Sequence, residues 1–316
     1  MKIGYACICL SLKGEDIGTN RSLIKKTLDT KGLDYVSEVS LLNAKDVIKI
    51  LKWNKENGIY FYRLSSAIIP WGDKIDIYRL KDYAEICYEL KKAGDYAKQN
   101  SIRITCHPGP YVVLTSPKES VVENAIKDLE MHAFIFDAMG LPRTPYNKIN
   151  IHCNGVYGDK KSAMDRFCEN FLRCSEGVRS RLTVENDDKA SMYSVKDLMY
   201  IHEKIGIPIV FDYHHHKFCT GDLTEEEALK LAATTWPKTI TPVVHYSESK
   251  ALHENNSKEK PQAHSDYINT LPNTYELDVD IMVEAKAKEL AILPFIGNER
   301  VCEYSGLIKT EAYEVL

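Results

Sequence analysis

Six residues of the types that bind divalent metal ions stand at the ends of short apolar runs along the chain. They are His107, His152, Glu185, Asp212, His245 and Glu284, which close the runs RITCH, INIH, LTVE, IPIVFD, TPVVH and DIMVE. Repeated β-branched runs that end in this way place all six residues on one rim of a parallel barrel, where barrel enzymes keep their chemistry. A buried carboxylate must be protonated or paired. Because no Arg or Lys stands directly alongside, we expect metal cations as the partners.

The residue types narrow the choice of metal. Imidazoles and carboxylates without cysteine suit Zn²⁺, Mn²⁺ or Fe²⁺ rather than a structural zinc or a Mg²⁺ site. One carboxylate can bridge two ions, and several ions together suit phosphodiester hydrolysis, because the attacking and leaving oxygens both need charge stabilisation. Taken singly, a strand histidine is more often a hydrogen-bonded core residue, and Glu185 or Asp212 could cap the following helix.

The segment DYHHH adds three histidines beyond Asp212. The sequence does not say which imidazole turns inward, and we expect two of the three at the surface or behind the metal ligands.

About eight strand-like runs alternate with helical stretches, which predicts a single closed (β/α)₈ barrel domain over residues 1–316. The strands are expected near residues 2–8, 59–65, 102–107, 149–153, 181–186, 208–213, 241–246 and 279–284. Helices are expected over 76–99, 119–140 and 164–178, from a Ser194 cap to Gly206, and from Thr224. The polar residues 248–265 are expected to form a loop over the rim. No glycine-rich nucleotide-binding pattern follows a strand, so no nucleotide cofactor is expected.

Composition gives looser bounds. The 316 residues carry a formal net charge of −4, so no overall basic field indicates nucleic acid, although bound cations would add positive charge. Nine cysteines without framework spacing indicate reduced thiols and an intracellular protein, cytoplasmic or, in a eukaryotic host, nuclear. No apolar stretch is long enough for a membrane span. A monomer is expected.

With these residues in view, the chain resembles the UV-damage endonuclease family, relatives of the apurinic endonuclease IV barrels. The matching stretches follow the family order and span nearly the whole chain. They are GYACICLSL, YRLSSAIIPW, HPGPYVVL, INIHCNGVYGDK, TVENDD, FDYHHHKF, VHYSES, AHSDYI and VDIMVEAK.

The resemblance implies a DNA repair nuclease that cuts immediately 5′ to UV photoproducts in double-stranded DNA and leaves a 3′-hydroxyl. Pyrimidine dimers, 6-4 products and abasic sites are its expected lesions. It also implies up to three divalent ions, generally Mn²⁺, with Zn²⁺ or others as alternatives. By motif, the ions would be held by His107, His152 and Glu185; by Glu185, Asp212, His245 and Glu284; and by His215 and His264. Glu185, His245 and Glu284 would be the catalytic members.

Lesion and DNA contacts follow from the same resemblance. Tyr5 and Tyr111 match tyrosines that contact the damage, where aromatic faces could fill the gap left by a flipped dinucleotide. An ordinary strand aromatic is the alternative for Tyr5. Arg63 and Lys160 are expected in rim loops, where a local basic patch could hold phosphates.

Four positions depart from the family pattern. Pro110 replaces a glutamine that probes the strand opposite the lesion, and Val243 replaces a lysine two residues before the strand histidine. Cys9 replaces an asparagine near the lesion pocket, and Asp73 stands near the place of a missing loop histidine. These changes leave the expected metal ligands intact and indicate altered damage recognition.

Two other functions compete with the nuclease. A barrel sugar isomerase or epimerase would need one metal pair and a closed sugar pocket, which leaves His215 and His264 without a role. A catalytically altered barrel that only binds damaged DNA predicts the loss of at least one metal ligand, but all six rim positions are retained. The sequence therefore favours the metal-dependent nuclease.

Overall fold

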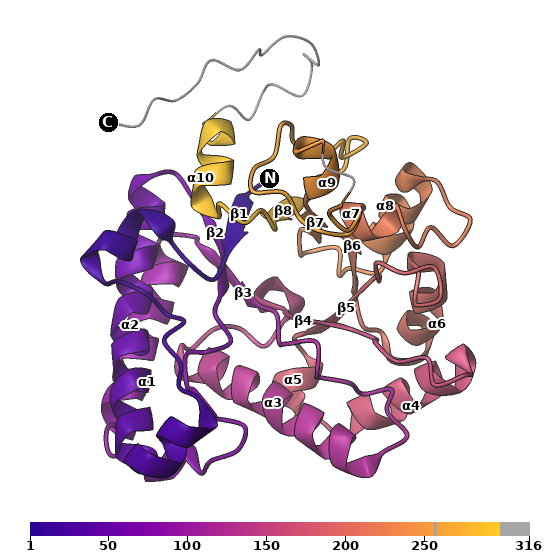
Figure 1. Cartoon of the computed structure of the whole chain (residues 1–316). Helices are drawn as coiled ribbons and strands as arrows, with labels where there is room; N and C mark the ends of the chain where they lie inside the picture. Colours follow the sequence, from indigo (N-terminus) through magenta and orange to yellow (C-terminus); the bar gives the residue numbers. More distant parts are fainter. Residues whose placement is uncertain (256–257, 298–316) are drawn as a thin grey trace.

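The computed structural model describes residues 1–255 and 258–297, and its centre is a closed parallel barrel (Figure 1). Its eight strands follow one another around the barrel in chain order. They are β1 (Ile3–Ala6), β2 (Phe61–Leu64), β3 (Arg103–Cys106), β4 (Ile149–His152), β5 (Leu182–Glu185), β6 (Ile209–Asp212), β7 (Val243–Tyr246) and β8 (Asp280–Val283). Strand β1 pairs with β8 and closes the ring. The predicted (β/α)₈ fold and all eight strand positions are confirmed.

Helices surround the barrel and connect successive strands (Figure 1). The α-helices are α1 (Lys25–Glu56), α2 (Tyr83–Gln99), α3 (Glu119–Ala138), α4 (Lys160–Leu172), α5 (Glu176–Arg179), α6 (Val195–Ile205), α7 (Tyr213–His216), α8 (Glu225–Thr234), α9 (Lys250–His253) and α10 (Glu289–Ile292). Short 3₁₀ helices are η1 (Leu10–Glu15), η2 (Ile77–Arg79), η3 (Pro145–Asn147) and η4 (Leu293–Phe295). Within the described residues, no helix has the length and apolar character of a membrane span.

Local sequence signals account for the helix boundaries. Ser194 and Thr224 each form a capping box at the start of their helix, and Gly206 ends α6 with a φ of 70°. The helix expected over 164–178 is instead two helices, because the Ser175 side chain accepts a hydrogen bond from the Val178 amide and starts α5. The predicted loop over 248–265 contains α9 and a bridge between Ser249 and His264.

The amino-terminal end of the barrel is closed by a buried ion pair. The Arg103 guanidinium lies 2.8 Å from the Asp280 carboxylate and also donates to the backbone carbonyls of Tyr146 and Thr241. Arg103 is fully buried. Removing one partner of such a pair costs about 3–5 kcal/mol, because the other charge stays buried without compensation. The buried polar residues at the amino-terminal end of the barrel therefore stabilise the fold. The candidate metal ligands stand at the other end, where the strands finish.

Strand register brings the predicted metal-binding residues to one level. His152 on β4 is the register partner of Glu185 on β5, and Asp212 on β6 is the partner of His245 on β7. Side chains alternate between the two faces of a strand, so residues in register on neighbouring strands point to the same side. Four of the six rim residues are thus placed together by backbone pairing alone.

Candidate metal centre

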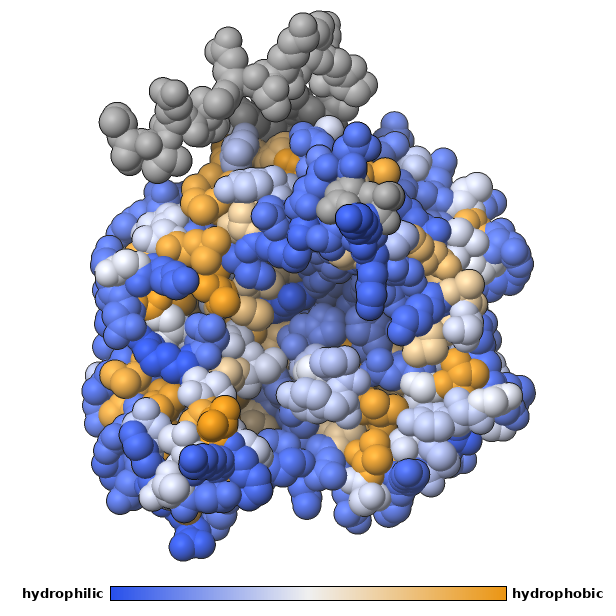
Figure 2. All heavy atoms as spheres, viewed as in Figure 1, coloured by the Kyte–Doolittle hydropathy of each residue, from blue (hydrophilic) through white to orange (hydrophobic). Residues whose placement is uncertain are grey.

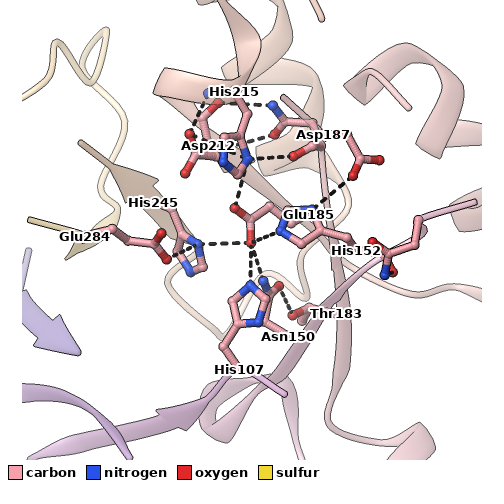
Figure 3. Close-up of polar contacts among 12 residues, drawn as sticks. His107, Asn150, His152, Thr183, Glu185, Asp187, Asp212, His215, His245 and Glu284 are labelled. Atoms are coloured by element: carbon pink, nitrogen blue, oxygen red, sulfur yellow. Dashed lines mark hydrogen bonds and ion pairs between the residues drawn. The ribbon is translucent and has the colours of Figure 1, made fainter. Parts of the chain in front are cut away.

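Glu185 lies buried at the middle of the rim, and four histidines point toward its carboxylate (Figure 3). Its Oε2 atom is 3.0 Å from Nδ1 of His245, 3.2 Å from Nε2 of His107 and 3.7 Å from Nε2 of His152. Its Oε1 atom is 3.4 Å from Nδ1 of His215. Oε2 of Glu185 thus faces three histidines and Oε1 faces a fourth, so this one carboxylate contacts residues of every predicted ion group.

Two acidic residues and one further histidine complete the surroundings. Glu284 Oε1 lies 3.2 Å from Nδ1 of His245, and Asp212 Oδ1 lies 3.9 Å from Nδ1 of His215. Nδ1 of His264 lies 3.9 Å from the Glu284 carboxylate. The structure thus gathers all eight predicted ligands at one place.

Two overlapping groups offer ligand atoms within 4.8 Å of one another. One group is His107, His152 and Glu185, and the other is Glu185, Asp212 and His245. Two buried carboxylate oxygens, Oε1 of Glu185 and Oδ2 of Asp212, have no hydrogen-bond partner. Buried anionic oxygens without donors are costly, and a cation would satisfy them. The donor set of imidazole nitrogens and carboxylate oxygens fits divalent ions of the Zn²⁺, Mn²⁺ or Fe²⁺ type.

Backbone carbonyls orient the two histidines predicted for a third ion. Nδ1 of His215 lies 3.0 Å from the Asn186 carbonyl, and Nδ1 of His264 lies 3.0 Å from the Glu284 carbonyl. A carbonyl oxygen only accepts, so each Nδ1 carries the hydrogen and each Nε2 is left as a possible ligand atom. The two rings lie 6.2 Å apart between centroids.

The run of three histidines is buried as a whole. His215 faces Glu185, whereas the His214 ring packs against Phe218 and His264, and the His216 ring packs against Phe211. Of the two places expected for the other histidines, the structure has the buried one: His214 and His216 lie behind His215 and not at the surface. Successive residues of a helix are offset by about 100°, so the three side chains of α7 point in three directions and contact different neighbours.

Sequence reasoning missed several polar residues that support the candidate ligands. Asn150 donates a hydrogen bond to Oε2 of Glu185, and the Thr183 hydroxyl donates to the Asn150 side-chain oxygen at 2.7 Å (Figure 3). Asp187 Oδ1 lies 3.4 Å from Nδ1 of His152, which directs the opposite nitrogen toward Glu185. The missed signal was the alternation within β4, since Asn150 stands two residues before His152 on the same face.

Two cationic side chains lie inside this end of the barrel, against the expectation that no Arg or Lys would be near. The Arg63 guanidinium forms an ion pair with Glu284, and Lys148 Nζ lies 3.0 Å from Nε2 of His245. Arg63 is a partly buried residue of β2, so its assignment to a rim loop was wrong. Because the Lys148 amine contacts Nε2 of His245, Nδ1 is the nitrogen of that ring that faces Glu185 and Glu284.

Burial and charge shift the titration of the cluster. Burial acts to raise the pKa of Glu185, but the imidazoles of His245 and His152 outweigh it and hold this pKa well below its usual range. Burial lowers the pKa of His107 to about 4. For His152, burial acts to lower the pKa, but Glu185 and Asp187 outweigh it and raise the pKa to about 9. Without a metal ion, protonated imidazole therefore balances the buried carboxylate charge.

The residues assigned to lesion contacts separate into buried and exposed positions. Tyr5 is fully buried, and its hydroxyl donates to Asn54 of α1 at 2.8 Å, so the ring points outward from the barrel rather than toward the rim opening. The structure therefore contradicts a lesion contact for Tyr5 and agrees with an ordinary strand aromatic. Cys9 is also buried, and burial raises its pKa to about 11. Pro110 and Tyr111 are exposed in the loop after β3.

The remaining predicted positions lie farther from Glu185. Lys160 starts α4 and forms an ion pair with Asp197 at 3.0 Å, while Asp73 pairs with Lys74 at 3.0 Å. Val243 is buried in the barrel interior. Figure 2 shows that the face seen in Figure 1 is hollowed at its centre and that mainly hydrophilic residues surround the hollow.

The fold is a TIM barrel, and the site gathers candidate ligands of the types that bind divalent metals. The chain matches the family described as UV-endonuclease UvdE over residues 1–312, and it belongs to that family. It is 33% identical to the UV DNA damage endonuclease of Clostridium perfringens over 99% of this chain and 74% of that protein. It is 36% identical to the UV-damage endonuclease of Schizosaccharomyces pombe over 92% of this chain and 49% of that protein.

Solved structures agree with this assignment. The crystal structure of SacUVDE shares 34% identity with a TM-score of 0.82, covering 94% of this chain and 96% of that chain. Endonuclease IV of Thermus thermophilus, at 14% identity and a TM-score of 0.53, shares the fold, as does a D-psicose 3-epimerase of Clostridium cellulolyticum at 10% and 0.50. The resemblance stated from the sequence is confirmed, and the chain is an endonuclease of UV-damage DNA repair.

The raised pKa of His152 predicts how the metal-free protein responds to pH. Its pKa is about 9 when folded, against about 6.5 in an unfolded chain, so its stabilising proton is fully bound in the folded state below pH 6.5. The proton on His152 should therefore contribute up to roughly 3 kcal/mol to the free energy of unfolding, and this contribution should be lost as the pH rises from 6.5 to 9. Thermal unfolding of chelator-treated protein across this range measures the loss.

A His152→Gln variant is the control, because it should remove most of that decline. Divalent ions should flatten the decline in the wild type, since metal binding displaces the same proton. An unfolding temperature that rises from pH 6.5 to 9 in the chelated wild type would contradict the assigned protonation.

Proposed function

We propose that this protein hydrolyses the phosphodiester bond immediately 5′ to UV photoproducts in double-stranded DNA, using a centre of up to three divalent ions, generally Mn²⁺. The observation that carries the proposal is the Glu185 carboxylate, which faces four histidines and belongs to both groups of candidate metal ligands. Membership of the UV-endonuclease family supports the substrate class. A 3′-hydroxyl end would be left for repair synthesis.

The eight gathered side chains would hold the ions in three groups. One ion would lie between His107, His152 and Glu185; a second between Glu185, Asp212, His245 and Glu284; and a third between His215 and His264. When bound, the ions would supply an activated water and stabilise negative charge on the attacking and leaving oxygens.

The protein's own side chains would prepare this centre for a phosphate. Arg63 neutralises part of the Glu284 charge, and Lys148 fixes the ring of His245 from the side opposite Glu185. Glu185, Asp212 and His245 are all fully buried, so electrostatic interactions among them are screened little by water. The partly exposed His107 and His152 border the opening, where the DNA backbone would approach.

Lesion recognition would fall to the loop after β3. Tyr111 has a side chain that is 68% exposed, and its ring lies across the backbone of Gly109. Pro110 beside it has no hydrogen-bonding group in its side chain, so this side chain cannot probe the opposite strand by hydrogen bonds. We infer that discrimination rests more on aromatic contact than on hydrogen bonding in this protein.

A sugar epimerase is the competing function, because such enzymes share the barrel fold. The closeness of His264 to His215 favours the nuclease, since a third pair of candidate ligand atoms has no place in a centre with one metal pair. Turnover of ketohexoses by the purified protein would favour the competitor.

Replacing Glu185 with Gln should lower the cleavage rate by more than about 100-fold, because a neutral amide cannot bridge two cations. The substitution keeps the side-chain shape, and nicking of a dimer-containing duplex measures its effect. Glu289→Gln is a matched control, since Glu289 is equally buried but accepts hydrogen bonds from Ser11. Full activity of metal-loaded Glu185→Gln would refute the bridging assignment.

Chelation should abolish nicking and Mn²⁺ should restore it, because the ions would supply the activated water and the charge stabilisation that hydrolysis needs. The measurement uses an end-labelled duplex with one thymine dimer, alongside undamaged and abasic duplexes. Cleavage just 5′ to the dimer is expected. Cleavage of the abasic duplex alone would instead indicate an activity like that of endonuclease IV, and activity in excess chelator would contradict the metal centre.

Pro110→Gln should raise the preference for dimer-containing over undamaged duplex by several-fold, because the amide restores a hydrogen-bonding group beside Tyr111. The ratio of kcat/KM values on the two duplexes measures this preference. Pro142→Gln is the control, since Pro142 is also exposed but precedes β4 at the opposite end of the barrel. An unchanged ratio would place lesion recognition elsewhere.

A further inference from the structure

The loop between β4 and α4 carries a half-exposed tyrosine that is not one of the candidate metal ligands. Tyr157 lies five residues after His152, and its side chain is 50% exposed. The loop adjoins the one that carries Tyr111: Asn154 donates to the Val112 carbonyl at 3.3 Å, and the Thr115 hydroxyl donates to the Cys153 carbonyl at 3.0 Å.

The Tyr157 backbone is held in an unfavourable conformation. Its φ is 51°, and the nearby Asn154 and Gly158 have φ values of 60° and 81°. A bulky residue in the left-handed region is strained, and such strain persists only where the surrounding structure enforces it. Here the Tyr193 hydroxyl donates to the Gly155 carbonyl at 3.2 Å and anchors the loop. Glycine would satisfy this backbone better than tyrosine, so folding alone does not account for the ring.

The Tyr157 ring is held by its neighbours and is still half exposed. A Cβ atom at Gly155 would lie 2.5 Å from the Tyr157 ring, so the ring rests directly on the Gly155 backbone. The Arg166 guanidinium lies 5.8 Å from the ring centroid and donates to the Thr115 carbonyl. The same arrangement recurs in the neighbouring loop, where the Tyr111 ring rests on Gly109 at 2.5 Å. Two exposed tyrosine rings are thus each supported by a glycine, in the loops that follow His107 and His152.

We propose that Tyr157 is a stacking platform for a base that leaves the helix when DNA is bound, a second aromatic contact beside Tyr111. The inference rests on the proposed DNA endonuclease function. A phosphate held at His107 and His152 would bring adjoining nucleotides to the two loops that follow these residues. The supported ring is half exposed, and any base can stack on an exposed aromatic ring whatever its sequence.

Stacking of one base on an aromatic residue is worth about 1–3 kcal/mol, which corresponds to a roughly 5- to 150-fold change in Kd. Tyr157→Gly should therefore weaken binding of a fluorescent duplex with one thymine dimer by that factor, as measured by anisotropy with the Mn²⁺-loaded protein and a non-hydrolysable linkage 5′ to the dimer. Its unfolding temperature should equal or exceed that of the wild type, because glycine relieves the positive φ. Tyr157→Phe and Tyr157→Trp should restore binding to within about twofold.

Tyr88→Ala is the matched control, since Tyr88 on α2 is 65% exposed but contributes nothing to the rim. Unchanged binding by Tyr157→Gly, or weak binding that comes with a lower unfolding temperature and no rescue by Phe, would overturn the proposal. Mn²⁺-dependent nicking by the wild type is measured alongside. Its absence refutes the proposed function, whereas wild-type nicking with normal binding by Tyr157→Gly refutes the platform alone.

Discussion

The buried charge of Glu185 is the constraint on which the site depends. A carboxylate with no exposed surface at the centre of a barrel cannot remain ionised without opposite charge nearby. Four histidines surround it, and the low pKa of Glu185 together with the raised pKa of His152 shows how the metal-free protein provides that charge. Divalent ions would take over this role and release the histidine protons, so folding, metal loading and pH are linked through one residue.

The barrel satisfies this constraint through the register of its strands and through hydrogen bonds to the Glu185 carboxylate. Backbone pairing sets His152 beside Glu185, while Asn150 and Thr183 form a hydrogen-bonded chain that fixes the carboxylate from below. Rigid strands hold the centre of the site, whereas the groups that would meet DNA lie on loops. This division lets the loops vary without disturbing the metal-binding geometry.

The sequence was sufficient for the barrel and for its rim residues, because a β-branched run followed by a ligand-type residue indicates both a strand and the level of its end. It was insufficient where orientation mattered. Tyr5 lies on a correctly predicted strand, yet its ring faces α1, a direction that depends on which face of β1 is inside. The three successive histidines are the same residue type, so the sequence could not show which one faces Glu185. Lys148 lies one residue before β4, and its inward direction follows only if the alternation of Asn150 and His152 is continued back to it.

The position of Lys148 also bears on the departure at Val243. Both residues are buried, but only Lys148 brings an amine beside His245, and burial lowers its pKa to about 7. A second lysine at position 243 would enter an apolar cluster with Phe61 and Val210, close to an interior that already holds Lys148, Arg63 and Arg103. Valine at this position preserves the packing of the apolar cluster and leaves Lys148 as the amine that contacts His245.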